Sequence, residues 1–169
     1  AEISVRAMEN LAAAKAADIV TLTVPFSHQA STLELVKEAL HGKILIDVTV
    51  PLVPPKVARV QLPPQGSAGQ IAQELLGEEV YVVSAFQNVA AAHLQEGRGL
   101  ECDVLVTGNK KVAREAVITL VEAAGMRGFH AGMINNAAAA EVLTSVLITI
   151  NKQYGCHAGI KISGLDDTH

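Results

Sequence analysis

Residues 80–93 constrain the fold of this chain more than any other segment. The segment reads VYVVSAFQNVAAAH, an apolar run followed by a polar turn and then by alanines. A continuous apolar run of this length is typical of a parallel strand whose sheet is covered by helices on both faces. The segment therefore predicts a buried strand at 80–85 and a small-residue helix near 89–95.

Helix and strand signals alternate along the rest of the chain. Helices are expected at 7–17, 31–40, 67–76, 110–124 and 135–152, and further strands at 18–24, 43–48, 102–107 and 127–131. Such alternation favours parallel strands joined by right-handed crossovers. We therefore expect an α/β fold with a Rossmann-like, doubly wound parallel sheet. The proline-rich loop 51–64 is long enough to suggest a functional segment.

Two helix starts carry local signals. Ser67 and Gln70 have the spacing of a capping box, which predicts that helix 67–76 begins at the serine. Asn109 stands directly before helix 110–124 and is expected to cap it. The sequence around Ser67, Gly-Ser-Ala-Gly, is interpreted as an ordinary capped helix start rather than as a phosphate loop, because no strand leads into it.

The C-terminal part of the chain contains a helix that is apolar on nearly every side, at 135–152. A helix of this kind is buried in a large body or against a partner, and we expect a dimer interface here. Glu141 interrupts the apolar run and is interpreted as a solvated or capping charge rather than a base. Residues 157–165 alternate in polarity and could form an edge strand.

Composition excludes several functions. The 169 residues are 50% hydrophobic and carry a formal net charge of −4. This acidic balance argues against a nucleic-acid partner, which would need clustered basic residues. No run of 18 apolar residues predicts a membrane span. Cys102 and Cys156 are far apart in sequence, which favours two reduced thiols in a cytoplasmic protein.

The segment that follows strand 80–85 has the composition of a cofactor site. Ligands of open α/β sheets lie beyond the carboxyl ends of the strands. Here that edge carries the ring of Phe86 and the carboxamides of Gln87 and Asn88 among small side chains, so a flat molecule could approach the backbone. The glycine-rich loop of dinucleotide folds is missing, as are a Ser-His-Asp set, a carboxylate pair and a metal-ligand cluster.

The chain resembles the F420:NADP oxidoreductases, the NADPH-dependent coenzyme F420 reductases. The resemblance covers nearly the whole chain and rests on AADIVTLTVPFSHQAST at 16–32, GKILIDVTVPL at 42–52, GSAGQIAQELLG at 66–77, VYVVSAFQNVAAAHL at 80–94, CDVLVTGNKKVAREAVITLVEAAGMRGFHAGMINNA at 102–137 and LITINKQYGCHAGIKISGL at 147–165. It implies transfer of a hydride between NADP(H) and the deazaflavin coenzyme F420. The cofactors would carry this chemistry, so no catalytic side chain and no metal is expected.

The resemblance also implies a division into two parts. Residues 1–85 would form a partial NADP-binding Rossmann domain that lacks its N-terminal glycine-rich unit, and the chain is therefore expected to be a fragment. Residues 86–169 would form a small C-terminal α/β portion that carries the deazaflavin side and ends in the long apolar helix. The hydride site would lie in the cleft between the two parts.

By resemblance, three short segments would bind the cofactors. The NADP side would be lined by Thr23, Val24, Pro25 and Phe26. The wall beneath the nicotinamide and deazaflavin rings would be Thr49, Val50 and Pro51. The deazaflavin would be framed by Ala85, Phe86, Gln87, Asn88 and Val89.

Two other functions remain open at this point. One is a different NAD(P)-dependent reductase on the same scaffold, such as a ferric reductase or a relative of pyrroline-carboxylate reductase. The other is a dimeric binding module without catalytic activity. Oxidation of the reduced deazaflavin by NADP would separate the favoured function from both.

Overall fold

The computed structural model describes residues 5–91, 94 and 101–165. A sheet with the strand order β1-β2-β3-β4-β5 forms its centre. Its strands are β1 (Ile19–Leu22), β2 (Ile44–Asp47), β3 (Tyr81–Ser84), β4 (Asp103–Gly108) and β5 (Arg127–His130). Its α-helices are α1 (Asn10–Ala16), α2 (Gln29–Val36), α3 (Ala68–Leu76), α5 (Lys111–Ala123) and α6 (Ala137–Tyr154). Short 3-10 turns are η1 (Phe26–His28), η2 (Lys37–Leu40) and η3 (Ile134–Asn136).

The expected α/β class is confirmed, with one difference in strand direction. Strands β1, β2 and β3 are mutually parallel, and β4 is parallel to β5. However, β4 runs antiparallel to β3, with register pairs at the ends of the two strands. Gly108 allows this contact, because a Cβ at that position would lie 2.7 Å from the carbonyl oxygen of Val82.

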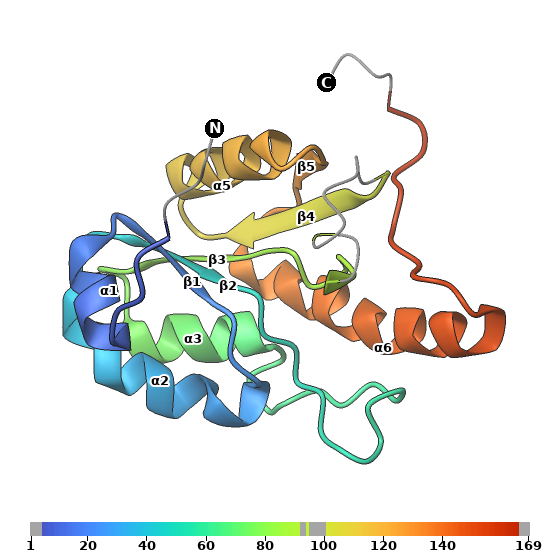
Figure 1. Cartoon of the computed structure of the whole chain (residues 1–169), viewed down its shortest axis with the longest axis horizontal. Helices are drawn as coiled ribbons and strands as arrows, with labels where there is room; N and C mark the ends of the chain where they lie inside the picture. Colours follow the sequence, from blue (N-terminus) through green and yellow to red (C-terminus); the bar gives the residue numbers. More distant parts are fainter. Residues whose placement is uncertain (1–4, 92–93, 95–100, 166–169) are drawn as a thin grey trace.

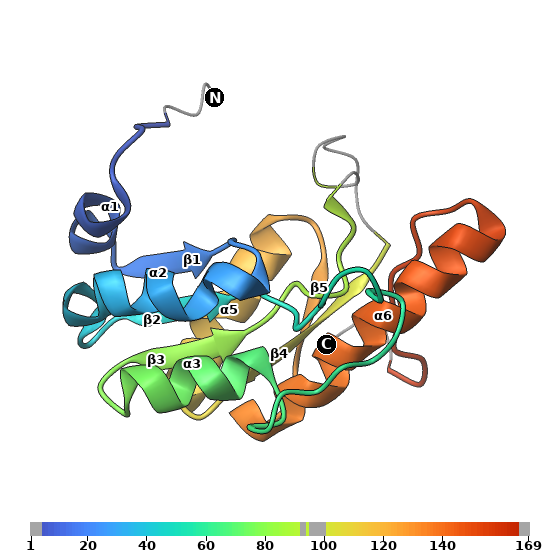
Figure 2. The ribbon, with the colours of Figure 1, turned by 90° about the horizontal axis from the view of Figure 1, so that it is seen from below.

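Helices cover both faces of the sheet, as Figure 1 shows. Helices α2 and α3 lie on one face, where they run alongside β1, β2 and β3 (Figure 2). Helix α5 lies on the opposite face. Successive strand residues point to opposite faces, so Leu45 packs toward α2 and α3 while Ile46 packs toward α5.

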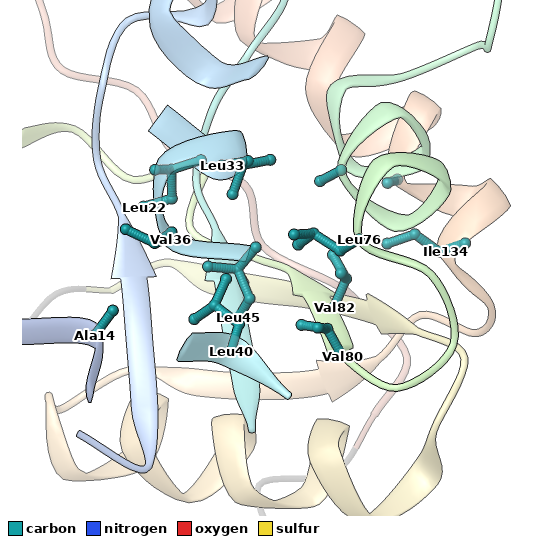
Figure 3. Close-up of a cluster of buried hydrophobic side chains, with 12 residues drawn as sticks. Ala14, Leu22, Leu33, Val36, Leu40, Leu45, Leu76, Val80, Val82 and Ile134 are labelled. Atoms are coloured by element: carbon teal, nitrogen blue, oxygen red, sulfur yellow. The ribbon is translucent and has the colours of Figure 1, made fainter. Parts of the chain in front are cut away.

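Each face therefore has its own apolar core. On the α2–α3 face, Leu33 and Leu76 pack against strand residues such as Leu22 and Val82 (Figure 3). The core of the α5 face consists mainly of branched or small apolar residues of β2, β3, β4 and α5, among them Ile46, Val83, Val104, Val106, Val117 and Val121. Packing on both faces holds the strands in place, so the carboxyl ends of the parallel strands β1, β2 and β3 lie at one edge of the sheet.

One predicted helix cap is confirmed and the other is wrong. The Ser67 hydroxyl accepts the backbone N–H of Gln70 at 3.0 Å, so α3 begins as expected. Asn109 does not cap α5, because the helix begins one residue later and its N-cap, Lys110, makes no side-chain cap bond. The Asn109 Oδ1 instead accepts the backbone N–H of Ile134 at 3.3 Å.

The expected edge strand at 157–165 is also wrong. The described residues of this segment contain no strand, although they lie beside the start of β4. The N–H of Asp103 donates to the carbonyl of Ile160 at 2.9 Å, and the N–H of Ile162 donates to the Asp103 carboxylate. Because the Asp103 side chain takes the place of a backbone acceptor, the ladder of a strand does not form.

Helix α6 is long, as expected. The expectation that it is apolar on nearly every side is not confirmed. Its buried positions are small or polar as well as apolar: Ala137, Ala140, Glu141, Ser145 and Leu147. Val146 and Tyr154 are exposed. No helix within the described residues has both the length and the apolarity needed to cross a membrane.

Candidate cofactor site

The sheet brings the three predicted cofactor segments to one edge. Leu22, Asp47 and Ser84 are register partners at the ends of β1, β2 and β3. Because these strands are parallel, the segments that follow them leave the sheet side by side. Those segments contain residues 23–26, 49–51 and 85–89, so the predicted site residues come together at the carboxyl edge.

A pocket of about 530 Å³ opens at this edge on the α5 face. Its walls are the ends of β1 and β2, the segment after β3 and one side chain of α5: Thr21, Thr23, Ile46, Val48, Phe86, Gln87, Val89, Ala91, Leu94 and Leu120. The size and mostly apolar walls are those of a small-molecule site. Thr23, Phe86, Gln87 and Val89 are the predicted residues that line it.

The other predicted residues lie around this pocket rather than in its wall. Val24 packs against the core of the α2–α3 face, while Pro25 and Phe26 begin the turn η1. Ala85 is buried in the core of the α5 face. Thr49, Val50 and Pro51 form the entry to the proline-rich loop, where Thr49 and Pro51 are buried.

Phe86 has an unusual backbone conformation. Its φ of 71° lies in the left-handed region, which side chains other than glycine rarely adopt. Such strain costs on the order of 1–3 kcal/mol and persists where the surrounding structure imposes it, often at ligand sites. In this chain the conformation changes the direction of the backbone after β3, where Phe86 lies in the wall of the pocket. Phe86 also packs against the core of the α5 face.

Gln87 is held in a fixed orientation. Its Nε2 donates to the backbone carbonyl of Asp47 at 3.1 Å and to the Ser84 hydroxyl at 2.6 Å. Both amide hydrogens are thereby used, since a carboxamide has two. The carboxamide oxygen is left as the group of this side chain that can accept a hydrogen bond from a ligand in the pocket.

Asn88 faces α6 instead of the larger pocket. Its Nδ2 donates to the carbonyl of Ala140 at 2.8 Å and to the Thr144 hydroxyl at 3.3 Å. The Thr144 hydroxyl donates in turn to the carbonyl of Gln87 at 3.0 Å. A second pocket, of about 160 Å³, adjoins these contacts and shares Gln87 and Val89 with the larger one.

The sequence prediction missed a buried polar network behind the site. Asp47 is 1% exposed, and its carboxylate accepts the N–H of Thr49 at 2.8 Å and the Gln29 Nε2 at 2.6 Å. The same Gln29 nitrogen contacts the Thr49 hydroxyl and the Ala68 carbonyl. Burial raises the pKa of Asp47 above its ordinary value. The sequence did offer a signal for this network, an aspartate inside the apolar run ILIDV, because a buried carboxylate needs hydrogen-bond partners.

Glu141 is the second buried carboxylate of this region, and it is 0% exposed. Its two oxygens accept the backbone N–H groups of Ala68 at 2.7 Å and Gly69 at 2.9 Å, at the beginning of α3. The interpretation of a capping charge is thus confirmed, and that of a solvated charge is wrong. Burial raises the pKa of Glu141 to about 7, against the lowering effect of the two N–H groups.

The occupied start of α3 also explains why Gly66–Gly69 is no phosphate loop. A helix N-terminus attracts anions through its free N–H groups. Here the chain supplies its own anion, since Glu141 fills the positions that a phosphate would take. The expected capped helix start is confirmed, and the site for an external anion is closed.

Comparison with known proteins places the chain in a family. Residues 1–51 match the family model for coenzyme F420-dependent NADP oxidoreductases. The F420-dependent NADP reductase of Methanocaldococcus jannaschii is 37% identical over 171 residues, which cover 98% of this chain and 76% of that protein.

Solved structures agree with this relationship. A proposed F420-dependent NADP reductase from Arthrobacter sp. FB24 superposes with a TM-score of 0.80 at 27% identity, over 89% of this chain and 70% of that one. A pyrroline-5-carboxylate reductase from Coxiella burnetii, at 16% identity and a TM-score of 0.51 over 89% of this chain and 53% of that one, shares the fold alone. The chain therefore belongs to the family of F420-dependent NADP reductases.

Proposed function

We propose that this protein transfers a hydride between NADP(H) and coenzyme F420 at the carboxyl edge of β1, β2 and β3. Family membership supports the two cofactors. The observation that carries the assignment of the site is the pocket of about 530 Å³, whose wall includes Phe86 and Gln87, with the Gln87 carboxamide held in one orientation. Apolar walls with one oriented polar group suit a flat, partly polar ring system.

Each predicted segment then has a role. Thr23, at the end of β1, offers its exposed side chain to the NADP side. Thr49 to Pro51 form a rigid wall, because Asp47 and Gln29 fix Thr49 from behind. The segment 85–89 would frame the deazaflavin, and the carboxamide oxygen of Gln87 would accept a hydrogen bond from an N–H of its ring.

The chain itself contributes binding, orientation and exclusion of water. When bound, the nicotinamide and the deazaflavin supply the hydride donor and acceptor, and a proton balances the reaction. The residues of the pocket would keep the reacting carbons about 3–3.5 Å apart, which is the distance that an effective proximity contribution requires. Apolar residues such as Val48 and Val89 would exclude water from that gap.

We further propose the assembly and location of the protein. Residues 1–85 form an NADP side and residues 86–169 a deazaflavin side. The protein acts in the cytoplasm. Two copies associate through the exposed face of α6, where Val146 is 45% exposed and Tyr154 is 76% exposed. Apolar groups of this size at a surface favour a protein partner when they form a patch.

A substrate profile tests the proposed function. The protein is mixed with NADPH and oxidised F420, and the visible absorbance of the deazaflavin is followed; parallel reactions contain a ferric chelate or pyrroline-5-carboxylate. We expect loss of the deazaflavin absorbance and no NADPH oxidation with the other two acceptors. NADPH oxidation with either alternative acceptor, but not with F420, would contradict the proposal.

A further inference from the structure

Helix α6 contacts the segment after β3, which is the candidate deazaflavin side, and also the proline-rich loop 51–64. Asn88 donates to Ala140 and Thr144 donates to Gln87, so α6 holds the segment after β3. On an adjacent stripe, the Ser145 hydroxyl donates to the carbonyl of Val57 at 3.1 Å, within the proline-rich loop. Figure 2 shows this loop crossing α6. The placement of α6 therefore determines where both loops lie.

One charged contact fixes α6 to the rest of the domain. Glu141 occupies the turn of α6 between Ala140 and Thr144, and its carboxylate accepts the N–H groups of Ala68 and Gly69. Helix α3 can approach this closely because Gly69 lacks a side chain. A Cβ there would lie 3.1 Å from Ile134 and 3.3 Å from the Cβ of Ala137.

We propose that Glu141 is a positioning residue for the deazaflavin wall of the site, acting through α6 and Thr144 on the carbonyl of Gln87. This inference rests on the proposed function. Glu141 itself lines neither pocket that touches the wall, so it acts at a distance from any bound ring. Because the proposed route runs through Thr144 to the carbonyl of Gln87, its effect is expected on the use of F420 more than on the use of NADPH.

The geometry explains why a carboxylate serves here and an apolar residue would not. The start of α3 presents two neighbouring N–H groups that need acceptors, and a carboxylate has two oxygens to match them. An apolar side chain could pack between α3 and α6 in several rotations of the helix. The paired hydrogen bonds permit one rotation, which fixes the direction in which Thr144 points. Replacement of a buried ionic group by apolar residues is often neutral or stabilising, so we expect the role of Glu141 in geometry rather than in stability.

The test compares E141Q with the wild-type protein at pH 8, in the intact chain. Glutamine keeps the size of the side chain but offers one acceptor oxygen in place of two. We expect the KM for F420 to rise about tenfold, the order that a misplacement of well under 1 Å produces, while the KM for NADPH changes less than about twofold. The affinity for oxidised F420, measured by its fluorescence without NADPH, should fall by a similar factor. E34Q, which makes the same change at an exposed position of α2, is the matched control.

A double-variant cycle tests the route through Thr144. If Glu141 acts through the Thr144–Gln87 hydrogen bond, T144A alone should raise the KM for F420, and E141Q should add little in its presence. If E141Q does not fold, E141D takes its place, because it keeps the charge but retracts the oxygens and should raise the same KM. Unchanged F420 kinetics and affinity in a folded Glu141 variant, or fully multiplicative effects in the cycle, would overturn the inference. A wild-type protein that neither binds nor reduces F420 would instead overturn the proposed function.

Discussion

The buried carboxyl of Glu141 makes a specific prediction about pH and stability. Its pKa is raised from 4.5 in a free side chain to about 7 in the folded protein. Between these values the unfolded chain releases a proton that the folded chain keeps. The free energy of unfolding therefore falls as the pH rises through this window. The contribution of protonated Glu141 to the free energy of unfolding is fully present below about pH 4.5 and is lost above about pH 7.

The size of the effect follows from the shift. One pKa unit corresponds to about 1.4 kcal/mol, so this group lowers the free energy of unfolding by about 3 kcal/mol between pH 4.5 and pH 8. In E141Q the neutral amide removes that dependence. Glutamine resembles the protonated acid, so the two proteins should be similar near pH 5, and E141Q should be the more stable protein at pH 8.

Urea denaturation at pH 5, 6, 7 and 8 measures this difference. Subtraction of the E141Q curve removes the contributions of titrating groups that do not interact with Glu141. Helix α3, the turn η3 and β4 pack against α6, and the charge of Asp47 at the end of β2 raises the pKa of Glu141 further, so its coupling to Glu141 is part of the measured difference. A difference that does not change with pH, or one in which the wild-type protein gains stability as the pH rises, would refute the reasoning.

Further predictions concern the site, the core and the C-terminal segment. Q87A should raise the KM for F420 about tenfold, because it removes the oriented carboxamide, with little change for NADPH; unchanged deazaflavin kinetics would contradict that role. L45A should lower the free energy of unfolding in urea by about 2–5 kcal/mol, since Leu45 is fully buried; a loss below about 1 kcal/mol would show that this core is not packed as described. D103N should speed hydrogen exchange at the amide of Ile162 by tenfold or more, because the variant loses a carboxylate that accepts from both Arg127 and that amide; unaltered exchange would mean that Asp103 does not hold the segment.

Much of the fold could be predicted because it depends on local patterns. The apolar run before Ser84 identified a buried strand, and Ser67 with Gln70 identified a helix start. Both signals act within a few residues of the chain. The convergence of residues 23, 49 and 86 at one edge also followed, because parallel strands must end on the same side of their sheet.

Other features depended on contacts between distant residues. The antiparallel pairing of β3 with β4 includes a close approach at Gly108 that leaves no room for a Cβ, and no local pattern predicts this pairing. Glu141 contacts Ala68 across 73 positions of sequence, so its role at the start of α3 could not be read from its alanine-rich surroundings. Asn109 looked like a helix cap, but its side chain instead accepts the N–H of Ile134 from another part of the fold.

The partners of Asp47 show that contacts between distant residues could not be predicted within the site either. An aspartate at the end of an apolar strand signals a buried carboxylate, yet its acceptor oxygens are paired with Gln29 of α2 and with the N–H of Thr49. Only the packing of α2 beside β2 brings Gln29 there. The sequence therefore predicted the cofactor segments, whereas the structure showed which buried contacts hold them in place.

Direct transfer of hydrogen between the two cofactors tests the central claim most closely. NADPH carrying deuterium at the transferable position of its nicotinamide is mixed with this protein and oxidised F420 in ordinary water, and the reduced deazaflavin is analysed by mass spectrometry. We predict one deuterium on its ring, because both cofactors would lie together in a pocket that excludes water. Reduced deazaflavin without deuterium, or no reduction at all, would contradict the account.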